Sequence, residues 1–156
     1  MPHEIQFVAQ SRIEAPAEVV FRWHAQPDAL ERLTPPWDPV EVVQRAPGIH
    51  DGDRGILRVH VGPLRIRWVF EHRDYIEGRQ FRDVQIEGPF HRWEHTHRME
   101  PHGAAGCILT DSIQYELPLG FAGKALGGWF VRRKLVRLFK YRHQVTAAAM
   151  LAHNEA

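Results

Sequence analysis

The sequence predicts an α+β fold in which a curved antiparallel sheet wraps around a long C-terminal helix. Three observations predict this fold: a strand-like start followed by two short helical segments, a series of alternating segments joined by short turns, and a long amphipathic segment at the end. Short turns between consecutive strands imply antiparallel pairing. A helix laid in a concave sheet leaves space wherever side chains do not fill it, so an internal cavity is expected.

The N-terminal part supplies one strand and two short helices. Apolar residues alternate over residues 4–13, which is typical of a strand with one buried face. Ala15-Pro16 then opens a helix, because proline is suited to the first helical turn. A second short helix begins at Pro27-Asp28 and ends at Thr34-Pro35-Pro36, since two prolines cannot continue a helix.

Six further segments have the alternation and the bounding turns of strands. They cover residues 40–45, 55–61, 64–75, 81–87, 91–100 and 106–117. After Pro118 the pattern changes to a helix that is expected from Gly127 to about His153. The apolar stripe of this helix consists of Val131, Leu135, Leu138, Phe139, Val145 and Ala149. A single domain over residues 1–156 accommodates all of these elements, and no internal repeat or linker divides them.

Composition excludes several classes of protein. The formal net charge is only +1 and no groove-reading motif is present, so nucleic-acid binding is not expected. Cys107 is the single cysteine, which excludes an internal disulfide and a cysteine zinc site, and it lies in no nucleophile motif. No run is apolar enough to span a membrane and no secretory signal is recognised, so a cytoplasmic location is expected.

The strand pair around Gly88-Pro89 is the most informative feature of the sequence. Side chains alternate across a strand, so the residues of this pair separate into two sets. The set predicted to meet solvent contains Arg82, Val84, Ile86, Arg92, Glu94, Thr96 and Arg98. The set predicted to point inward contains Phe81, Asp83, Gln85, Trp93, His95, His97 and Met99. Buried polar groups cost free energy unless they are paired, so this inward face indicates a hydrated interior that contacts a ligand.

The expected ligand-contacting set combines polar and aromatic side chains. It consists of Trp68, Phe70, Phe81, Asp83, Gln85, Trp93, His95, His97, Asp111, Tyr115, Phe139 and Arg142. Arg142 interrupts the apolar stripe of the last helix and is predicted to bond Asp83 or Asp111 across the cavity. Two interpretations stay open: the polar network orients a polar group of an otherwise apolar ligand, or it is a self-satisfied polar core. The aromatic members are likewise cavity wall or core, and Trp68 and Trp93 are expected to reach the cavity.

Two chemical alternatives use the same side chains. His95 and His97 on one strand face, with Asp111, have the composition of a site with two histidines and one carboxylate, but no metal or other cofactor is assigned. A histidine beside an aspartate can act as a general base, and a tyrosine hydroxyl such as that of Tyr115 can stabilise an enolate. No catalytic residue is assigned, and the candidates for a cyclase or dehydratase reaction are His95, Asp111 and Asp83.

The C-terminal helix is strongly basic. No acidic residue occurs between Leu117 and Asn154, a segment that contains Lys124, Arg132, Arg133, Lys134, Arg137, Lys140 and Arg142. With Phe121, Leu126, Trp129 and Phe130 beside these charges, the helix fits a weak contact with an anionic membrane or a partner, which is a third class of function. The same charges equally fit the solvated face of an ordinary helix. The sequence predicts no particular oligomeric state.

Several local motifs occur in a recognisable order: Ile13-Glu-Ala-Pro16, Leu33-Thr-Pro-Pro36, Phe81-Arg-Asp-Val-Gln85, Gly88-Pro-Phe90, Trp93-Glu-His-Thr-His97, Asp111-Ser-Ile-Gln-Tyr115 and Tyr141-Arg-His143. Together they resemble the START-like, or SRPBCC, superfamily of polyketide cyclases, lipid carriers and plant Bet v 1 allergens, and most closely its bacterial ligand-binding, cyclase/dehydrase-like subgroup. The resemblance implies a helix-grip fold whose cavity binds a small, mainly hydrophobic molecule of lipid, polyketide or aromatic type. Only some members are enzymes, so binding without chemistry is the first expectation.

Overall fold

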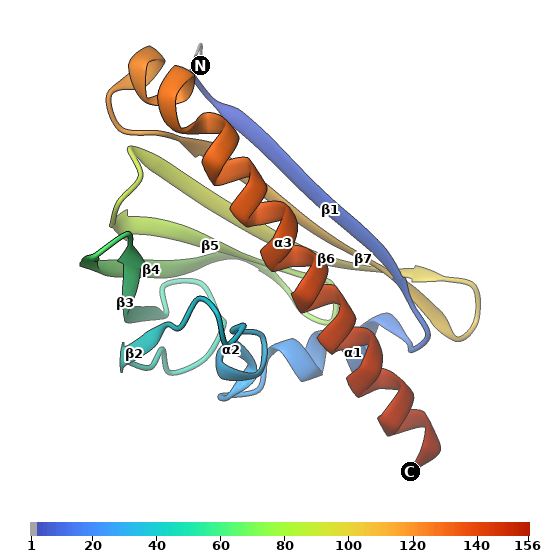
Figure 1. Ribbon diagram of the computed structural model, residues 1–156. Coiled ribbons are helices and arrows are strands. Elements are labelled where there is room, and N and C mark those ends of the chain that lie inside the picture. Colours follow the sequence, from blue (N-terminus) through green and yellow to red (C-terminus); the bar gives the residue numbers. More distant parts are fainter. Residues whose placement is uncertain (1–2) are drawn as a thin grey trace.

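A computed structural model describes residues 3–156 and confirms the predicted fold class, a curved antiparallel sheet around a long C-terminal helix (Figure 1). The strands are β1 (Ile5–Ile13), β2 (Glu41–Gln44), β3 (Arg54–Val61), β4 (Leu64–Ile76), β5 (Gln80–Glu87), β6 (Arg92–His102) and β7 (Gly106–Glu116). The helices are α1 (Ala17–His24), α2 (Ala29–Arg32) and α3 (Gly120–Glu155). Every expected element is present within these residues, with bounds that differ by one or two residues except at α3.

The seven strands form one sheet in the order β1-β7-β6-β5-β4-β3-β2. All neighbours are antiparallel, so the chain runs as a meander from β2 to β7, and β1 pairs with β7 at one edge. Figure 1 shows α3 crossing the sheet, with α1 and α2 beside the C-terminal half of that helix. The inner faces of β5, β6 and β7 therefore lie beneath the middle of α3.

The start of α3 differs from the prediction. The helix begins at Gly120 and not at Gly127, although four glycines lie in its first nine residues. Leu119 and Gly120 both have positive φ angles, 67° and 53°, and this left-handed turn brings the chain from β7 into the helix. The four glycines lower the helix propensity of this segment. Their cost is smaller than the free energy gained when a long helix continues its backbone hydrogen bonds. Among the described residues no helix is both long and apolar enough to cross a membrane.

The apolar core has two parts. One part joins α1, the end of β6, the start of β7 and the end of α3 through Val20, Phe21, Met99, Leu109 and Met150. The other joins β1, β7 and the middle of α3 through Phe7, Ile113, Tyr115, Leu135 and Phe139. Between the two parts, each of the central elements carries polar residues, and these residues form the layer described below.

The close approach of α3 to the end of β7 predicts opposite effects of two glycine substitutions. A Cβ atom at Gly123 would lie 1.9 Å from the carbonyl oxygen of Pro118, whereas at Gly128 the nearest atom is Cγ of Lys124 at 3.9 Å. Gly123→Ala is expected to lower the free energy of unfolding by about 1–3 kcal/mol because the backbone must move. Gly128→Ala is expected to raise it by about 0.5–1 kcal/mol through helix propensity. Urea denaturation measures both, and equal effects of the two substitutions would contradict the tight turn.

Candidate functional site

Asp111 lies at the centre of a buried polar layer between sheet and helix. Its carboxylate accepts hydrogen bonds from His95 Nε2 at 2.7 Å and from His143 Nε2 at 2.7 Å. A third imidazole nitrogen, Nδ1 of His97, lies 3.0 Å from Oδ1. The Asp111 side chain is only 5% exposed, and these donors replace the water that it loses on folding. One carboxylate thus joins β6, β7 and α3.

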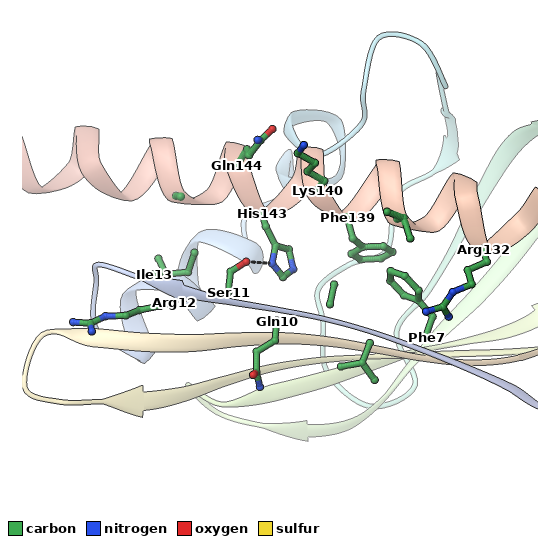
Figure 2. Close-up of a pocket in the computed structure, with 14 residues that line it drawn as sticks. Phe7, Gln10, Ser11, Arg12, Ile13, Arg132, Phe139, Lys140, His143 and Gln144 are labelled. Carbon is green, nitrogen blue, oxygen red and sulfur yellow. Dashed lines mark hydrogen bonds between the residues drawn. The ribbon is translucent and has the colours of Figure 1, made fainter.

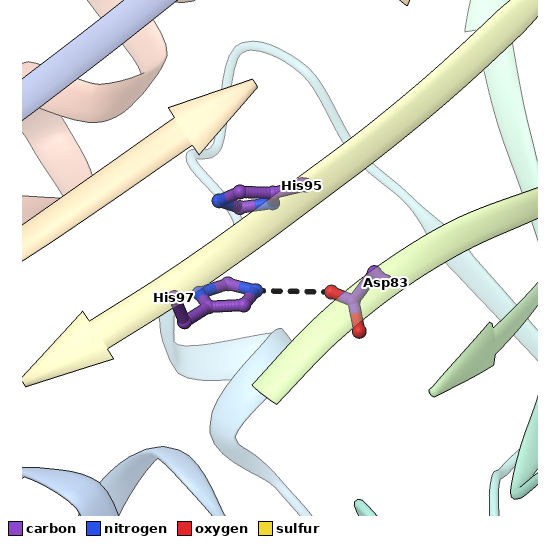
Figure 3. Close-up of side chains that lie close together, drawn as sticks. All are labelled: Asp83, His95 and His97. Atoms are coloured by element: carbon purple, nitrogen blue, oxygen red, sulfur yellow. Dashed lines mark hydrogen bonds and ion pairs between the residues drawn. The ribbon is translucent and has the colours of Figure 1, made fainter. Parts of the chain in front are cut away.

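Asp83 on β5 is the second carboxylate of the layer. Its Oδ2 lies 3.0 Å from Nε2 of His97, and its Oδ1 lies 2.6 Å from Nδ1 of His72 on β4 (Figure 3 shows Asp83, His95 and His97). The pair with His72 is poorly aligned for a hydrogen bond, and these two buried atoms have no other partner within residues 3–156. The Asp83 side chain keeps 26% of its exposure, whereas His72 and His97 keep 8% and 9%. Asp83 is therefore the more exposed of the two acidic side chains, although its Oδ1 is buried.

Strand register brings these residues together. His72 is opposite Asp83 across β4 and β5, and Asp83 is opposite His95 across β5 and β6. His97 is opposite Asp111 across β6 and β7. Side chains that are directly opposite, or diagonal to one another, on the same face of a sheet lie within contact distance. The alternation in the sequence predicts which residues point inward, and the register decides which of them meet.

His97 is the cation of this layer. Each of its ring nitrogens lies 3.0 Å from a carboxylate oxygen, an arrangement that is favourable when both nitrogens carry hydrogen. Burial opposes the charge, but the hydrogen bonds to Asp111 and Asp83 outweigh it and raise the pKa of His97 to about 9. The stacked ring of Phe81, with its centroid 4.3 Å away, covers one face of the imidazole. His97 is therefore an imidazolium at neutral pH.

The neighbouring imidazoles and carboxylates adjust to this cation. Burial and the positive charge of His97 lower the pKa of His95 to about 4, so His95 is neutral. Burial also lowers the pKa of His24 to about 4, despite the bond from its Nδ1 to the carbonyl of Val20. Burial would raise the pKa values of Asp83 and Asp111, but the histidine donors lower both well below the usual range. Two carboxylates are therefore ionised in the layer.

The predicted ion pair of Arg142 with Asp83 or Asp111 is wrong. Nε of Arg142 donates to the carbonyl oxygen of Leu33 at the end of α2, at 3.2 Å, and no carboxylate of the described residues lies within ion-pair distance. The next residue, His143, occupies the helix position that faces Asp111. Burial lowers the pKa of Arg142, while the charges of Asp111 and Asp83 favour its cationic form. Arg142 and His97 together balance the two carboxylates, and Arg142 does so through space.

The predicted aromatic members fall into two groups. Phe81, Tyr115 and Phe139 are almost completely buried, and Phe139 packs edge-on against His95 at 5.2 Å. Trp68, Phe70 and Trp93 are only partly buried. The rings of Trp68 and Trp93 meet at right angles with centroids 5.3 Å apart, and Phe90 touches both. This second group forms an incompletely covered aromatic wall on the inner face of β4 and β6.

Two of the predicted polar residues are placed differently from Asp83. The amide of Gln85 is engaged by the turn between β5 and β6, because Nε2 donates to the carbonyl of Phe90 at 2.8 Å and Oε1 accepts from its N–H at 3.3 Å. The hydroxyl of Tyr115 is buried and has no partner within the described residues, and burial raises its pKa. Burial also raises the pKa of Cys107 to about 11, which makes that thiol a poor nucleophile.

A groove of ≈ 490 Å³ lies between β1 and α3 (Figure 2). Its lining includes Phe7, Ser11, Phe139, Lys140 and His143. Nδ1 of His143 lies 2.7 Å from the hydroxyl of Ser11, while Nε2 of the same ring donates to Asp111. The polar layer therefore extends from the edge groove, through Asp111 and His97, to Asp83.

Asp83, His95 and His97 have the composition of a metal site. Their ligand atoms all lie within 4.8 Å of one another. Nε2 of His95, both ring nitrogens of His97 and Oδ2 of Asp83 are, however, engaged with one another or with Asp111, and the layer already contains a cation that balances its carboxylates. A metal ion would have to displace the proton of His97 and both of its ion pairs, so the internal network uses these residues more completely than a metal site would.

Sequence reasoning missed three buried histidines of the layer: His24, His72 and His143. His72 continues the alternation of Trp68 and Phe70 on β4, a signal that could have placed it inward. His143 follows Phe139 by four residues on the apolar face of α3. The sequence pattern predicts the polar contact of this face for the neighbouring Arg142 instead. Trp23-His24 is one of the local matches to the superfamily, but only the packing of α1 shows that His24 is buried.

The imidazolium of His97 predicts a pH optimum of stability. Its pKa rises from 6.5 to about 9 on folding, so its stabilising contribution is complete below pH 6.5 and is lost as pH rises to about 9. The pKa of His95 falls from 6.5 to about 4, so stability also decreases as pH falls through that window. His97→Gln is expected to remove the alkaline decrease, and His91→Gln, at an exposed ring, to retain it. Melting temperatures across this range measure the effect, and an unchanged alkaline decrease in His97→Gln would refute the assignment.

The three partners of Asp111 predict a large cost for removing its charge. Asp111→Asn leaves His97 with one carboxylate and is expected to cost about 3–5 kcal/mol of unfolding free energy. Asp38, whose side chain is 29% exposed, pairs with Lys134 at 3.2 Å on the surface, so Asp38→Asn is the matched control. It is expected to cost less than about 1 kcal/mol. Similar denaturation midpoints for the two variants would show that the buried layer does not stabilise the fold.

The comparisons with known proteins agree with this architecture. Residues 13–141 match the family described as polyketide cyclase / dehydrase and lipid transport. A crystal structure of a Thermus thermophilus protein is similar with a TM-score of 0.70 and 24% identity, covering 96% of this chain and 99% of that one. The Zhui aromatase/cyclase from a Streptomyces species has a TM-score of 0.65 and 17% identity, covering 98% and 94%. A START superfamily protein from Mycobacterium smegmatis has a TM-score of 0.68 and 12% identity, covering 94% and 97%.

Identities at this level show the shared fold alone, and no curated protein matches the sequence significantly. The family match, by contrast, spans most of the chain and includes every strand from β2 to β7 together with both short helices. The chain therefore belongs to the polyketide cyclase / dehydrase and lipid transport family.

Proposed function

We propose that this protein binds a small, mainly hydrophobic molecule between the concave face of the sheet and α3. The observation that carries the proposal is the incomplete cover over Trp68, Phe70 and Trp93, side chains that a closed core would bury. Family membership supports the same conclusion, because its description joins polyketide cyclases with lipid transport. The expected ligand is of lipid, polyketide or aromatic type.

The charges in the layer define the polar end of this proposed site. The partly exposed Asp83 side chain lies next to the cation of His97, and the aromatic wall of Trp68, Phe70 and Trp93 lies on the same face of the sheet. A ligand with an apolar body and one hydrogen-bonding group matches this pairing. Among the residues expected to contact the ligand, the partly exposed ones would touch it. The buried ones would support them from behind: Phe81, Tyr115, His95, His97, Asp111 and Phe139.

Acid–base catalysis of a cyclase or dehydratase type is the second candidate. The pairing of Asp83 with His97 favours it because the two groups have defined and opposite charges. The same pairing limits the chemistry. A carboxylate whose pKa lies far below its usual range is a weak base, and Asp83 is such a carboxylate. The neutral His95 is a better base, but it is only 4% exposed. Ligand binding therefore explains Asp83, His95 and His97 without requiring a strong or accessible base, which catalysis would need.

Docking to a membrane or a partner, the third class, would use another part of the molecule. Most of the residues that suggested it, among them Leu126, Trp129 and Phe130, are exposed on α3, whereas the proposed ligand site lies between the inward side and the sheet. Docking and ligand binding are therefore compatible, and each can be tested separately.

Native mass spectrometry of gently purified protein, followed by extraction, tests the binding proposal. We expect one co-purifying hydrophobic compound, and we expect Trp93→Ala to retain at least about tenfold less of it. Asp83→Asn is expected to weaken retention if the ligand carries a hydrogen-bond donor, and Glu87→Gln, on the outer face of the same strand, is the matched control. For protein that purifies empty, titration with anilinonaphthalene sulfonate replaces the natural compound. Failure of the wild type to bind that probe, or equal binding by Trp93→Ala, would contradict the proposal.

A further inference from the structure

The start of α3 carries an unusual concentration of uncovered apolar side chains. Five large residues are between 60% and 87% exposed: Leu119, Phe121, Leu126, Trp129 and Phe130, which we call the apolar tip. Side chains of this size that lie so far out of the core within one short segment are typical of a surface that is covered in use. The apolar tip lies at the end of the molecule where β1 begins, away from α1 and α2 (Figure 1).

A second group of residues gives this surface its charge. Lys124, Arg132, Arg133, Arg137 and Lys140, which we call the basic belt, have no carboxylate within ion-pair distance among residues 3–156. Arg133 lies over the ring of Trp129 with 5.4 Å between guanidinium carbon and ring centroid, and Arg137 lies 4.2 Å from the centroid of Trp37. No acidic residue interrupts α3 before Glu155. The basic belt is therefore available to an external anion.

Members of the two groups share one side of the helix, whereas Arg132 lies over Phe7 at the groove beside β1. Leu126, Trp129 and Phe130 follow the spacing that places residues on one helical face, and Arg133 and Arg137 continue that face in the next two turns. The result is an apolar end followed by a cationic zone along the same line. Interfacial helices bind anionic bilayers in this arrangement, because apolar side chains enter the acyl boundary while lysine and arginine meet the phosphates.

We propose that the apolar tip and the basic belt dock this protein on the surface of an anionic lipid bilayer. Docking would be peripheral, since no described helix can cross a membrane. A second copy of the chain is a poorer occupant of this surface. Two tips facing each other would bring two basic belts and the positive ends of two helix dipoles together, and these like charges repel.

Docking would also orient the fold. Val131 and Leu135, on the inward side of the same part of α3, pack in the cluster that includes Trp93 and Phe90. Through Trp93 the aromatic wall adjoins the inward side of this part of α3, so a membrane-soluble molecule would have a short path between bilayer and protein. The docking proposal itself rests only on the outward side of α3 and holds whether or not a ligand binds inside.

Flotation with vesicles tests this proposal. Wild-type protein is expected to float with vesicles of phosphatidylcholine containing about 30% phosphatidylglycerol at low salt. Binding is expected to fall at least about tenfold with vesicles of phosphatidylcholine alone, or when about 0.5 M NaCl screens the charges. Absence of flotation with the anionic vesicles at low salt would overturn the proposal.

Matched variants locate the surface. Leu126→Ser with Trp129→Ser is expected to reduce partitioning at least about tenfold, whereas Leu151→Ser, at a 54% exposed residue near the other end of α3, is expected to leave it unchanged. Arg133→Gln with Arg137→Gln is expected to reduce it about fivefold for each charge. Arg67→Gln with Arg98→Gln, on the sheet, keeps the same net charge as that variant and is the control. Equal losses in the test and control variants would overturn the assignment.

A dimer formed through the apolar tip is the competing outcome. Light scattering during size-exclusion chromatography distinguishes it, because the proposal expects the same mass for wild type and for Leu126→Ser with Trp129→Ser. If the wild type is a dimer and Leu126→Ser with Trp129→Ser is a monomer, the apolar tip binds a second copy of the chain and the bilayer proposal is overturned. Circular dichroism of each variant checks that the substitutions, all at exposed positions, leave the fold intact.

Discussion

The carboxylate of Asp111 is the interaction on which the rest of this structure depends. It is bonded to β6 through His95 and to α3 through His143, while it also shares His97 with Asp83. The helix is therefore attached to the sheet by directional bonds as well as by apolar packing. Directional bonds fix the rotation and the register of α3 on the sheet, which apolar contacts alone leave less defined. The aromatic wall keeps its position because the layer beside it does.

Charge balance explains why so many histidines are tolerated inside the fold. Two buried carboxylates require compensation, and the imidazolium of His97 provides it between them, with Arg142 contributing through space. Once His97 is charged, His95 and His24 are held neutral by burial and by the neighbouring positive charge. The layer therefore has a definite charge state. Its more exposed end at Asp83 would present a fixed charge to the proposed ligand, and its closed end at Asp111 stabilises the fold.

Most of the fold could be predicted from the sequence, because strand alternation and short turns leave few ways to arrange the segments. The alternation of β5 and β6 also placed Asp83, His95 and His97 inward. The partners could not be predicted, because register and helix rotation decide them. Arg142 and His143 are adjacent, and a rotation of about 100° per residue determines which one faces Asp111. The start of α3 was not predicted, because glycines usually mark the end of a helix. Here the close approach of the helix to Pro118 requires a glycine at position 123.

The charge state of the layer depends on His97 being an imidazolium held between two carboxylates. A proton–nitrogen NMR correlation spectrum of the imidazole rings, recorded at about pH 8 with His97→Gln for assignment, tests it most directly. Both ring nitrogens of His97 are expected to carry protons there, and those of His95 and His24 are expected to give the pattern of neutral rings. A neutral His97 at that pH would contradict this charge assignment, because Asp83 and Asp111 would then lack the cation that joins them.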